Sequence, residues 1–508
     1  MLFNSFAFLF LFLPLVLAGY FWLGRLDPRW AAGWLALASL FFYGYWEVRY
    51  LPLLLASITF NYWCGQVIGA ALGTARRRCL QGAIGLNLLL LAYYKYANFL
   101  VDSVNLIGQA GWEPWHVVLP IGISFFTFTQ IAFLVDSYHA KVKQYRFIDY
   151  LLFVSYFPHL IAGPVLHHND MMPQFAEPAN YRPSAPNFAI GLSIFVLGLA
   201  KKMLIADNLA PMASPVFAPG AEPQLIEAWV GVLAYTFQLY FDFSGYSDMA
   251  IGLSRLFGVR LPLNFNSPYK AANISQFWRC WHMSLSRFLR DYLYFPLGGS
   301  RDGRARRYRN LMLTMLLGGL WHGAGWTFVI WGGLHGLYLV LHQVWDRLAA
   351  KAAFRAARGW VVFSRAVTFG AVMLGWVFFR APDTGTALGV LAAMAGRNGI
   401  SLPSGMAKFQ GLWHALGLRA EYHGIATVDV GGPGLPMLAA AILIAFLAPN
   451  TQEIFDHYEP CSDRIFQLQG KRSFRWRPAP GWSLVFVLLF FSCLLSMNRV
   501  TEFLYFQF

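Results

Sequence analysis

Long apolar runs recur along nearly the whole chain, and they constrain its fold more than any other feature. Such runs match the length of a helix that crosses a hydrocarbon core roughly 30 Å thick. Only 12% of the 508 residues are charged, whereas soluble domains average about 25%. No stretch alternates apolar and polar residues for long enough to predict barrel strands. The sequence therefore predicts an all-α polytopic membrane protein.

The apolar runs predict 12 spans, or 11 if one short run does not cross. We expect them at approximately 3–23, 30–46, 50–73, 79–99, 117–138, 187–206, 226–252, 311–322, 325–345, 360–379, 435–449 and 481–497. Two segments, 157–174 and 264–310, are broken by Pro and Gly or are amphipathic, which predicts re-entrant or interfacial structure. For 157–174 an ordinary amphipathic loop remains an alternative.

The net charge of +15 comes from basic residues in short connections between apolar runs, such as Arg76–Arg78, Lys141–Arg146 and Arg304–Arg309. This distribution is typical of cytoplasmic loops and argues against nucleic-acid binding. With 12 spans, both termini are predicted to lie outside. Five scattered cysteines predict neither a disulfide framework nor a zinc site.

Two histidines stand out in apolar surroundings. His322 lies in LLGGLWHGAGW beside Trp321, and His282 lies 40 residues earlier in FWRCWHMSLSR beside Trp281. A titratable side chain at membrane depth is a functional-site hypothesis by default, and imidazole suits proton transfer near neutral pH. We expect a hairpin to bring both rings into one cavity. A hydrogen-bonded structural histidine, or a metal site that includes His335, remains an alternative.

Charged residues within other apolar runs also need partners. Asp242 and Asp248 in YFDFSGYSD are expected to face a cavity or a cation, because an unpaired charge in lipid is costly. Lys201 and Lys202 are expected to face protein or to snorkel.

Together, SQFWRCWHMSLSRFLRDYLYFPLGG and TMLLGGLWHGAGWTFVIWGGLHG resemble the membrane-bound O-acyltransferase (MBOAT) family. More narrowly, they resemble its bacterial branch of alginate O-acetylation and teichoic-acid D-alanylation proteins. FPHLIAGPVLHHNDMMPQF and LYFDFSGYSDMAIGLSRLFG extend the resemblance over most of the chain. Cys280 departs from the pattern, which favours a basic or polar residue there.

The resemblance implies a central catalytic chamber in which His322 is the general base and His282 its partner. It implies acetyl-CoA as the donor. No metal is expected, because the tryptophans that flank the two histidines are not accompanied by acidic or cysteine ligands. Substrate-binding roles are expected for Trp321, Trp281, Arg287, Arg290 and Asp242. The two arginines, like Arg304–Arg309, would receive the donor's phosphates, although cytoplasmic topology alone also accounts for arginines there.

The resemblance also implies the setting, a bacterial inner membrane with both termini in the periplasm. The whole chain, 1–508, would form one MBOAT domain, with N-terminal spans at 1–146, the catalytic core at 147–345, and C-terminal spans and an outer tail at 346–508. In the tail NRVTEFLYFQF, Tyr505 could carry an acyl group to a periplasmic acetyltransferase or esterase-like partner. An interfacial aromatic anchor is the alternative.

The acceptor expected from the resemblance is an exopolysaccharide such as alginate or cellulose. Peptidoglycan or teichoic acid is the runner-up, and a lipid or protein acceptor is less favoured. A polymer exporter with histidines along its pore is the competing class of protein.

Overall fold

A computed structural model of the chain describes residues 1–142, 145–161, 163–301, 303–402, 404–415, 417, 420–421, 434–463, 474–497 and 504. The chain divides into two compact units. The first comprises residues 1–199, 246–264 and 451–507, and the second comprises 200–245, 265–450 and 508.

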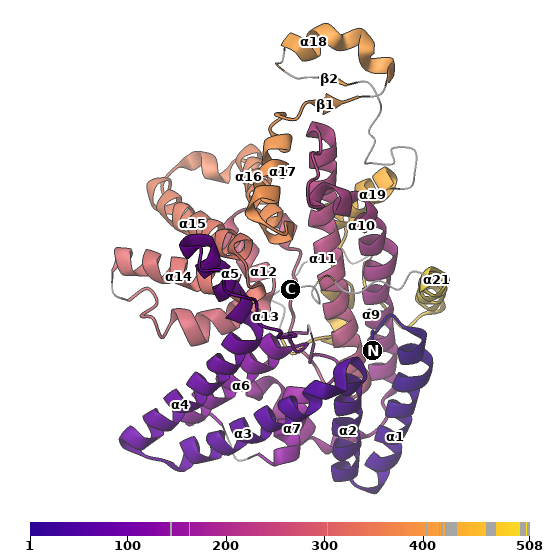
Figure 1. The fold of residues 1–508 in the computed structure, drawn as a ribbon. Coiled ribbons are helices and arrows are strands. Elements are labelled where there is room, and N and C mark those ends of the chain that lie inside the picture. Colours follow the sequence, from indigo (N-terminus) through magenta and orange to yellow (C-terminus); the bar gives the residue numbers. More distant parts are fainter. Residues whose placement is uncertain are drawn as a thin grey trace. The chain divides into compact units, whose positions relative to one another are not determined.

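Helices dominate the chain up to residue 200, where η marks short 3-10 and π segments (Figure 1). They are η1 Phe8–Phe12, α1 Leu13–Leu26, α2 Pro28–Glu47, η2 Val48–Tyr50, α3 Leu51–Ala70, α4 Gly73–Leu91, η3 Ala92–Tyr96, α5 Ala97–Gly108, α6 Ile123–Tyr138, α7 Phe147–Ser155, α8 His168–Phe175, η4 Pro178–Tyr181 and α9 Ala185–Ala200.

The remaining elements are also almost all helical. They are η5 Lys201–Ala206, α10 Asp207–Ala213, η6 Ser214–Phe217, α11 Leu225–Leu256, η7 Pro268–Lys270, α12 Ile274–Cys280, α13 Met283–Leu289, η8 Arg290–Tyr294, α14 Arg304–His322, α15 Trp326–Leu348, η9 Ala353–Ala356, α16 Arg358–Arg380, α17 Thr384–Met394, β1 Ile400–Ser401, η10 Ser404–Phe409, α18 Gln410–Ala415, β2 Ala420–Glu421, α19 Gly434–Leu447, α20 Thr451–Phe455, η11 Asp456–Tyr458 and α21 Pro480–Ser496. The parallel pair β1–β2 aligns Ile400 with Ala420.

In the first unit, α3, α4 and α6 pack around a small apolar cluster that includes Cys64, Ile68 and Leu134. Two buried asparagines join α3 to α4, since Asn61 and Asn87 donate side-chain amide hydrogen bonds to each other at 3.1 and 2.7 Å. Reciprocal amide bonds of this kind satisfy polar groups between membrane helices.

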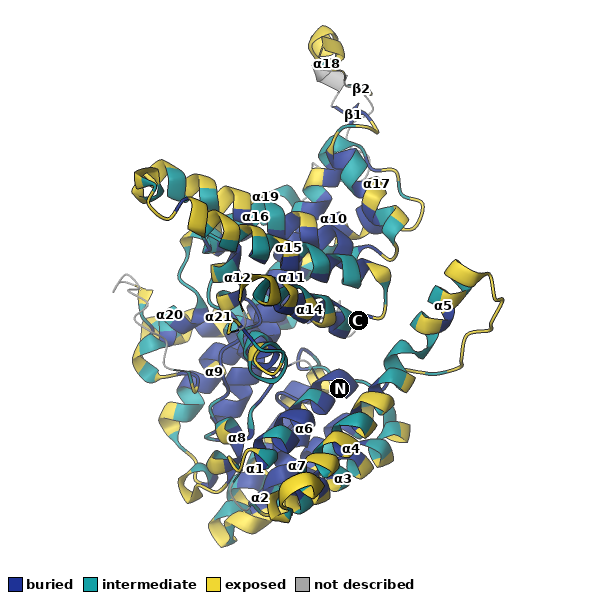
Figure 2. Ribbon diagram, turned by 90° about the vertical axis from the view of Figure 1, so that its left-hand side faces the viewer, coloured by how far each residue is buried: buried dark blue, intermediate teal, exposed yellow. Residues whose placement is uncertain are grey.

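Many large apolar side chains on the outer helices are exposed, as the yellow stretches of α1, α2 and α5 show (Figure 2). Trp22, for example, is 64% exposed and Leu15 is 58% exposed. An apolar surface of this extent is expected where lipid, not water, is the solvent. This confirms the predicted all-α membrane fold.

Five helices among the described residues are long and apolar enough to cross a membrane: Phe8–Leu26, Pro28–Ala70, Gly73–Gly108, Ala185–Phe217 and Arg358–Arg380. The pair Gly434–Leu447 and Thr451–Tyr458 would make a sixth if counted as one span. The 43 residues of Pro28–Ala70 would extend about 65 Å as one helix, twice the thickness of the hydrocarbon core. This stretch is therefore long enough for the two predicted spans at 30–46 and 50–73. The total of 12 spans stays a prediction.

Several predicted boundaries are wrong. Arg76–Arg78 lie inside α4 and Arg304–Arg309 lie in the first turns of α14, where loops were expected. The predicted span 117–138 begins only at Ile123, and 13 of the 16 residues of α6 are buried in protein. The outer segment after 379 contains α17, whose N-cap Asp383 accepts a hydrogen bond from the Thr386 backbone. Of these helices only α17 starts at a side-chain cap, whereas α4, α6 and α14 start without one. Hydropathy measures neither capping nor packing between helices, so it does not fix where a helix begins.

Candidate active site

His282 occupies a sharp turn between two short helices of the second unit. Asn273 caps α12 by accepting a hydrogen bond from the Gln276 backbone at 2.8 Å, and α12 ends at Cys280. Trp281 is extended, and His282 then adopts a left-handed conformation with φ +43° before α13 begins. Such a conformation is strained for a residue with a Cβ and is found mostly where the surroundings hold it in place. The turn therefore fixes the direction of the His282 ring.

His322 is the last residue of α14, and three residues separate it from α15. The helices cross closely because the crossing is lined by glycine. A Cβ added to Gly319 would lie 3.0 Å from the Cα of Gly332, and one added to Gly336 would lie 2.8 Å from the Met312 sulfur. In the break itself, a Cβ on Gly323 would collide with the ring of Phe328. The GGLWHG pattern thus permits the tight hairpin that places His322.

The two imidazoles lie together, as the sequence predicts. Their ring centroids are 6.1 Å apart at an interplanar angle of 52°. Both rings are buried; His282 is 0% exposed and His322 is 5% exposed. Burial in apolar surroundings favours the neutral form of an imidazole, which is the form that can accept a proton.

Aromatic rings surround this histidine pair. His322 contacts Trp321 at 4.9 Å, Trp331 at 5.1 Å and Phe379 at 5.3 Å, measured between ring centroids. His282 contacts Phe243 at 4.8 Å and, at 6.1 Å, Trp321 as well. The predicted residue Trp321 therefore touches both imidazoles.

Trp281 belongs to a neighbouring aromatic layer. Its ring lies 4.9 Å from Trp376, 5.0 Å from Phe265 and 5.6 Å from Phe277. His335 is fully buried beside the same layer, 5.2 Å from Trp278 and 4.9 Å from Trp331. In the described part of the chain, no three His, Cys, Asp or Glu residues gather into a group that could hold a metal ion.

Sequence reasoning missed Phe243, Trp331, Trp376 and Phe379. Phe243 and Phe379 come from α11 and α16, far from either histidine in sequence. Trp331 carried a usable signal, because WHGAGWTFVIW places it on the helix that immediately follows the His322 break.

The predicted arginines lie on or just after α13. Arg287 is half-buried, whereas Arg290 is 56% exposed and binds Asp291 through Nε at 2.7 Å and Nη2 at 3.1 Å. These hydrogen bonds raise the pKa of Arg290, so that the guanidinium stays charged. Asp291 offsets much of that charge locally, and the substrate-binding roles of both arginines stay predictions.

Asp242 has the cationic partner that its apolar surroundings require. Lys202 is buried and contacts Asp242 at 2.7 Å and Asp207 at 2.8 Å. In the first unit, Asp248 accepts a hydrogen bond from the Thr451 hydroxyl. Asp242 is thus part of a buried charge cluster, and a direct contact with substrate stays a prediction. Tyr505 lies outside the described residues.

Comparisons with known proteins agree with this architecture. Residues 87–379 match the model of the membrane-bound O-acyltransferase family. A peptidoglycan O-acetyltransferase of Helicobacter pylori is 43% identical over 90% of both chains. A probable alginate O-acetylase of Azotobacter vinelandii is 48% identical over 78% of both chains. A teichoic acid D-alanyltransferase of Streptococcus thermophilus is 28% identical over 51% of this chain and 68% of its own.

The matched region contains His282, His322 and most of the aromatic rings around them. The alginate and peptidoglycan relatives both act as O-acetyl-transferring enzymes by their names, and the matches to them span most of the chain. The chain is therefore an O-acyltransferase and belongs to the membrane-bound O-acyltransferase family.

Proposed function

We propose that this chain takes an acetyl group from cytoplasmic acetyl-CoA and delivers it outward for O-acetylation of an exopolysaccharide, alginate or cellulose. The observation that carries the proposal is the pair of buried imidazoles 6.1 Å apart inside an aromatic enclosure. The probable alginate O-acetylase among the relatives supports a polysaccharide acceptor.

His322 acts as the general base in the transfer. It accepts the proton of an acceptor hydroxyl while that oxygen attacks the thioester carbonyl carbon. The C–S bond then breaks, and the protonated His322 returns the proton to the departing thiolate, so that ester and thiol leave with no net change at the enzyme. His282 lies across the reacting group, where its ring can orient the hydroxyl or stabilise the developing charge.

The donor and the acceptor polymer lie on opposite sides of the membrane, which explains why the enzyme spans it. The donor is made in the cytoplasm and the polymer is modified outside the inner membrane, so the acetyl group must cross. A periplasmic acetyltransferase or esterase-like partner would complete the delivery to the polymer.

Substitution of His322 tests the catalytic assignment. We expect His322→Ala to lower acetylation by roughly 10²- to 10⁴-fold, the contribution of a positioned general base. The measurement is the ester content of secreted polymer, together with the amount of polymer exported. The exposed His116→Ala serves as the matched control. Loss of export rather than of acetylation in His322→Ala would favour the exporter class instead.

Peptidoglycan is the second candidate acceptor. The Helicobacter pylori relative is similar over 90% of both chains, a longer match than the 78% of the alginate relative. Expression of this chain in a host that lacks its own O-acetyltransferase, followed by ester analysis of purified glycan and of polymer, distinguishes the two acceptors.

A substitution in the predicted outer tail tests whether the acetyl group reaches the polymer through Tyr505. If Tyr505 carries the acetyl group transiently, Tyr505→Phe removes the accepting hydroxyl and keeps the aromatic anchor. We expect polymer acetylation to fall to background while hydrolysis of acetyl-CoA by the purified protein continues. Full polymer acetylation in Tyr505→Phe would leave only the anchoring role.

A further inference from the structure

A cavity of about 270 Å³ lies within the first unit, where the ends of three packed helices meet. The end of α3 contributes Gly65, Gln66 and Gly69, α4 contributes Arg76, and the end of α6 contributes Phe133 and Ser137. Figure 1 shows these three helices side by side. We call this cavity the α3–α4–α6 pocket. The proposed transfer reaction makes no use of it.

The pocket lies at the level where the chain is expected to leave the membrane. Two of the candidate spans end beside it, Pro28–Ala70 at its last residue and Gly73–Gly108 at its first. Leu72, in the connection between them, is 82% exposed, and Trp63 on α3 is 62% exposed. Tryptophan is enriched at the boundary between hydrocarbon and headgroups. The phosphates of the surrounding lipids are therefore expected at the depth of the pocket.

Two glycines shape the α3 side of the pocket. A Cβ added to Gly65 would collide with the ring of Phe133, so Phe133 fills the space over this buried glycine. A Cβ added to the exposed Gly69 would meet no described atom within 4 Å. The space over Gly69 is thus the open part of the pocket.

The α6 side of the pocket is a well-defined helix end. The Lys141 backbone donates to the Asp136 carbonyl at 3.0 Å. The Ala140 backbone, whose φ is +55°, donates to the Ser137 carbonyl at 3.1 Å. This pair of bonds around a left-handed residue is the Schellman motif, which satisfies the last carbonyls of a helix. The Ser137 carbonyl therefore has a backbone donor of its own, and capping of α6 does not depend on an arginine.

Arg76 nevertheless reaches this helix end from α4. Its Nη2 donates to the Ser137 carbonyl at 2.9 Å, and its guanidinium carbon lies 5.4 Å from the centroid of the Tyr138 ring. Within the described part of the chain, no carboxylate forms an ion pair with Arg76. A guanidinium has five N–H donors in a fixed fork, so it can hold this carbonyl and still bind an anion.

The side chains around the pocket add positive charge. Arg77 and Arg78 follow Arg76 and are exposed, and the Lys141 side chain is 62% exposed. Asp136 opposes them, but it is buried and already lies 3.1 Å from His168 and 3.6 Å from Lys141. The helix ends contribute roughly half a charge each, negative for α3 and α6 and positive for α4. The arginines outweigh that sum, so the pocket favours an anion.

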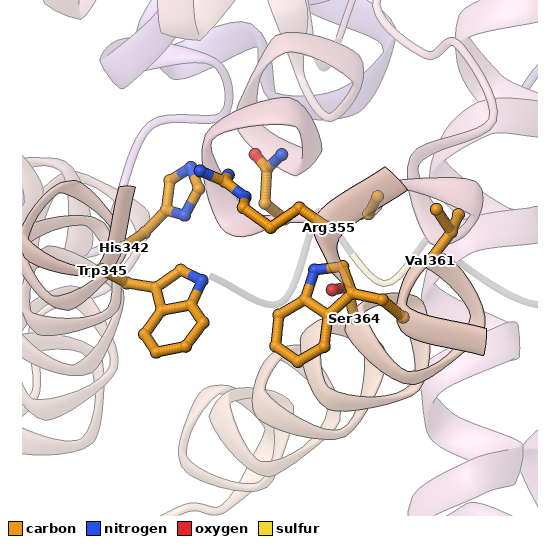
Figure 3. Close-up of a pocket in the computed structure, with 8 residues that line it drawn as sticks. His342, Trp345, Arg355, Val361 and Ser364 are labelled. Atoms are coloured by element: carbon orange, nitrogen blue, oxygen red, sulfur yellow. The ribbon is translucent and has the colours of Figure 1, made fainter. Parts of the chain in front are cut away.

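A cavity beside α15 and α16 in the second unit provides a contrast. Its volume is about 180 Å³, and Figure 3 shows the Arg355 guanidinium extending toward the His342 ring there. Asp346 contacts both groups and offsets their charge. An anion therefore gains less from Arg355 than it does from Arg76.

We propose that the α3–α4–α6 pocket binds the headgroup of an anionic phospholipid, with the phosphate on Arg76 and the acyl chains against the exposed apolar surface of α3. Basic pockets between membrane helices are a recognised kind of site for anionic lipid headgroups. The position of the pocket at the ends of two candidate spans favours a lipid over a soluble anion. The bound lipid holds the ends of α3, α4 and α6 together.

Binding of phosphatidylglycerol to the detergent-purified protein tests the proposal. Native mass spectrometry measures binding of this lipid and of phosphatidylcholine with the same acyl chains. We expect a preference for phosphatidylglycerol, which Arg76→Gln weakens about fivefold or more, the scale of one arginine beside an anionic lipid. Arg77→Gln removes the same charge from an exposed position outside the pocket and should weaken binding much less. Equal losses in the two variants would overturn the proposal, because they would indicate attraction to surface charge alone.

A second substitution fills the pocket and keeps the arginine. Gly69→Leu should reduce phosphatidylglycerol binding by a factor comparable to that of Arg76→Gln. Gly82→Leu is the matched control, since Gly82 is an exposed glycine of α4 with no described atom within 4 Å of an added Cβ. Without lipid, the two leucine variants should unfold at similar temperatures. Wild-type binding in Gly69→Leu would show that the lipid lies elsewhere.

Unfolding temperatures with different anions identify the source of the phosphate. Phosphatidylglycerol should raise the unfolding temperature of the wild type but not of Arg76→Gln, whereas inorganic phosphate should raise neither. An Arg76-dependent rise with inorganic phosphate would make the pocket a site for soluble anions, and the lipid assignment would be wrong. His322→Ala should bind phosphatidylglycerol as the wild type does, because the site is separate from the transfer chemistry.

Discussion

Lys202 shows at the scale of one residue how a charge is kept at membrane depth. Its ammonium lies between two carboxylates, at 2.7 Å from Asp242 and 2.8 Å from Asp207, with 2% of its side chain exposed. Removing one partner from a buried ion pair is strongly destabilising, by about 3–5 kcal/mol, because the opposite charge stays buried. The cluster can therefore be probed one residue at a time.

We expect Lys202→Met to lower the thermal stability of the detergent-purified protein markedly, because two carboxylates lose their shared ammonium. Lys351→Met is the control, since Lys351 is exposed. Adding Asp242→Leu to Lys202→Met should restore part of the loss. Unfolding temperatures measured for the four proteins check this, and similar values for the two single variants would contradict it.

The α14–α15 hairpin is the element on which the site depends. A Cβ on Gly332 would collide with the backbone oxygen of Met315, whereas one on Gly333 would meet the Leu316 Cδ2 at an ordinary 3.5 Å. Backbone atoms cannot move aside as a flexible side chain can. The helices can approach this closely only because Gly332 has no side chain.

Gly332→Ala and Gly333→Ala form a matched pair of neighbouring substitutions. We expect Gly332→Ala to push the helices apart, at an overpacking cost of about 1–3 kcal/mol, and to reduce acetylation by displacing His322 from His282. Gly333→Ala should be neutral or slightly stabilising, because Ala has the higher helix propensity. Unfolding and acetylation assays on both variants check the prediction. Equal stability and equal acetylation in the two variants would show that α14 and α15 can move apart without disturbing the site.

The distribution of charge along the whole molecule predicts its orientation. Basic residues recur at the helix ends and connections expected on the cytoplasmic side, including Arg347, Lys351, Arg355 and Arg358 from the end of α15 to the start of α16. Positively charged connections are retained in the cytoplasm during insertion. The 23 residues of α16 extend about 35 Å, long enough to reach the other side.

Reporter fusions check this orientation. A fluorescent protein fused after Ala352 should fluoresce, whereas alkaline phosphatase fused after Pro382 should be active, because the phosphatase folds only outside the cytoplasm. Active phosphatase fused after Ala352 would reverse the assigned orientation.

The sequence by itself determined the all-α membrane class, the family, and the pairing of His282 with His322. These follow from local properties: apolar length, charge in connections, a tryptophan beside each histidine, and the glycines around His322. It also indicated that Asp242 faces a cavity or a cation. It did not place the start of α14 at Arg304, because a helical turn of arginines and a loop of arginines have the same hydropathy.

Only the tertiary structure decided which side chains enclose the histidines and which cation meets Asp242. Phe243, Phe379 and Lys202 come from helices whose mutual packing no local pattern specifies. The left-handed turn at His282 and the stacking of Trp345 on Trp360 likewise depend on contacts between distant segments. The physical reason is that an apolar helix in lipid can present any face to a neighbour, and close packing and polar pairing between helices select the face.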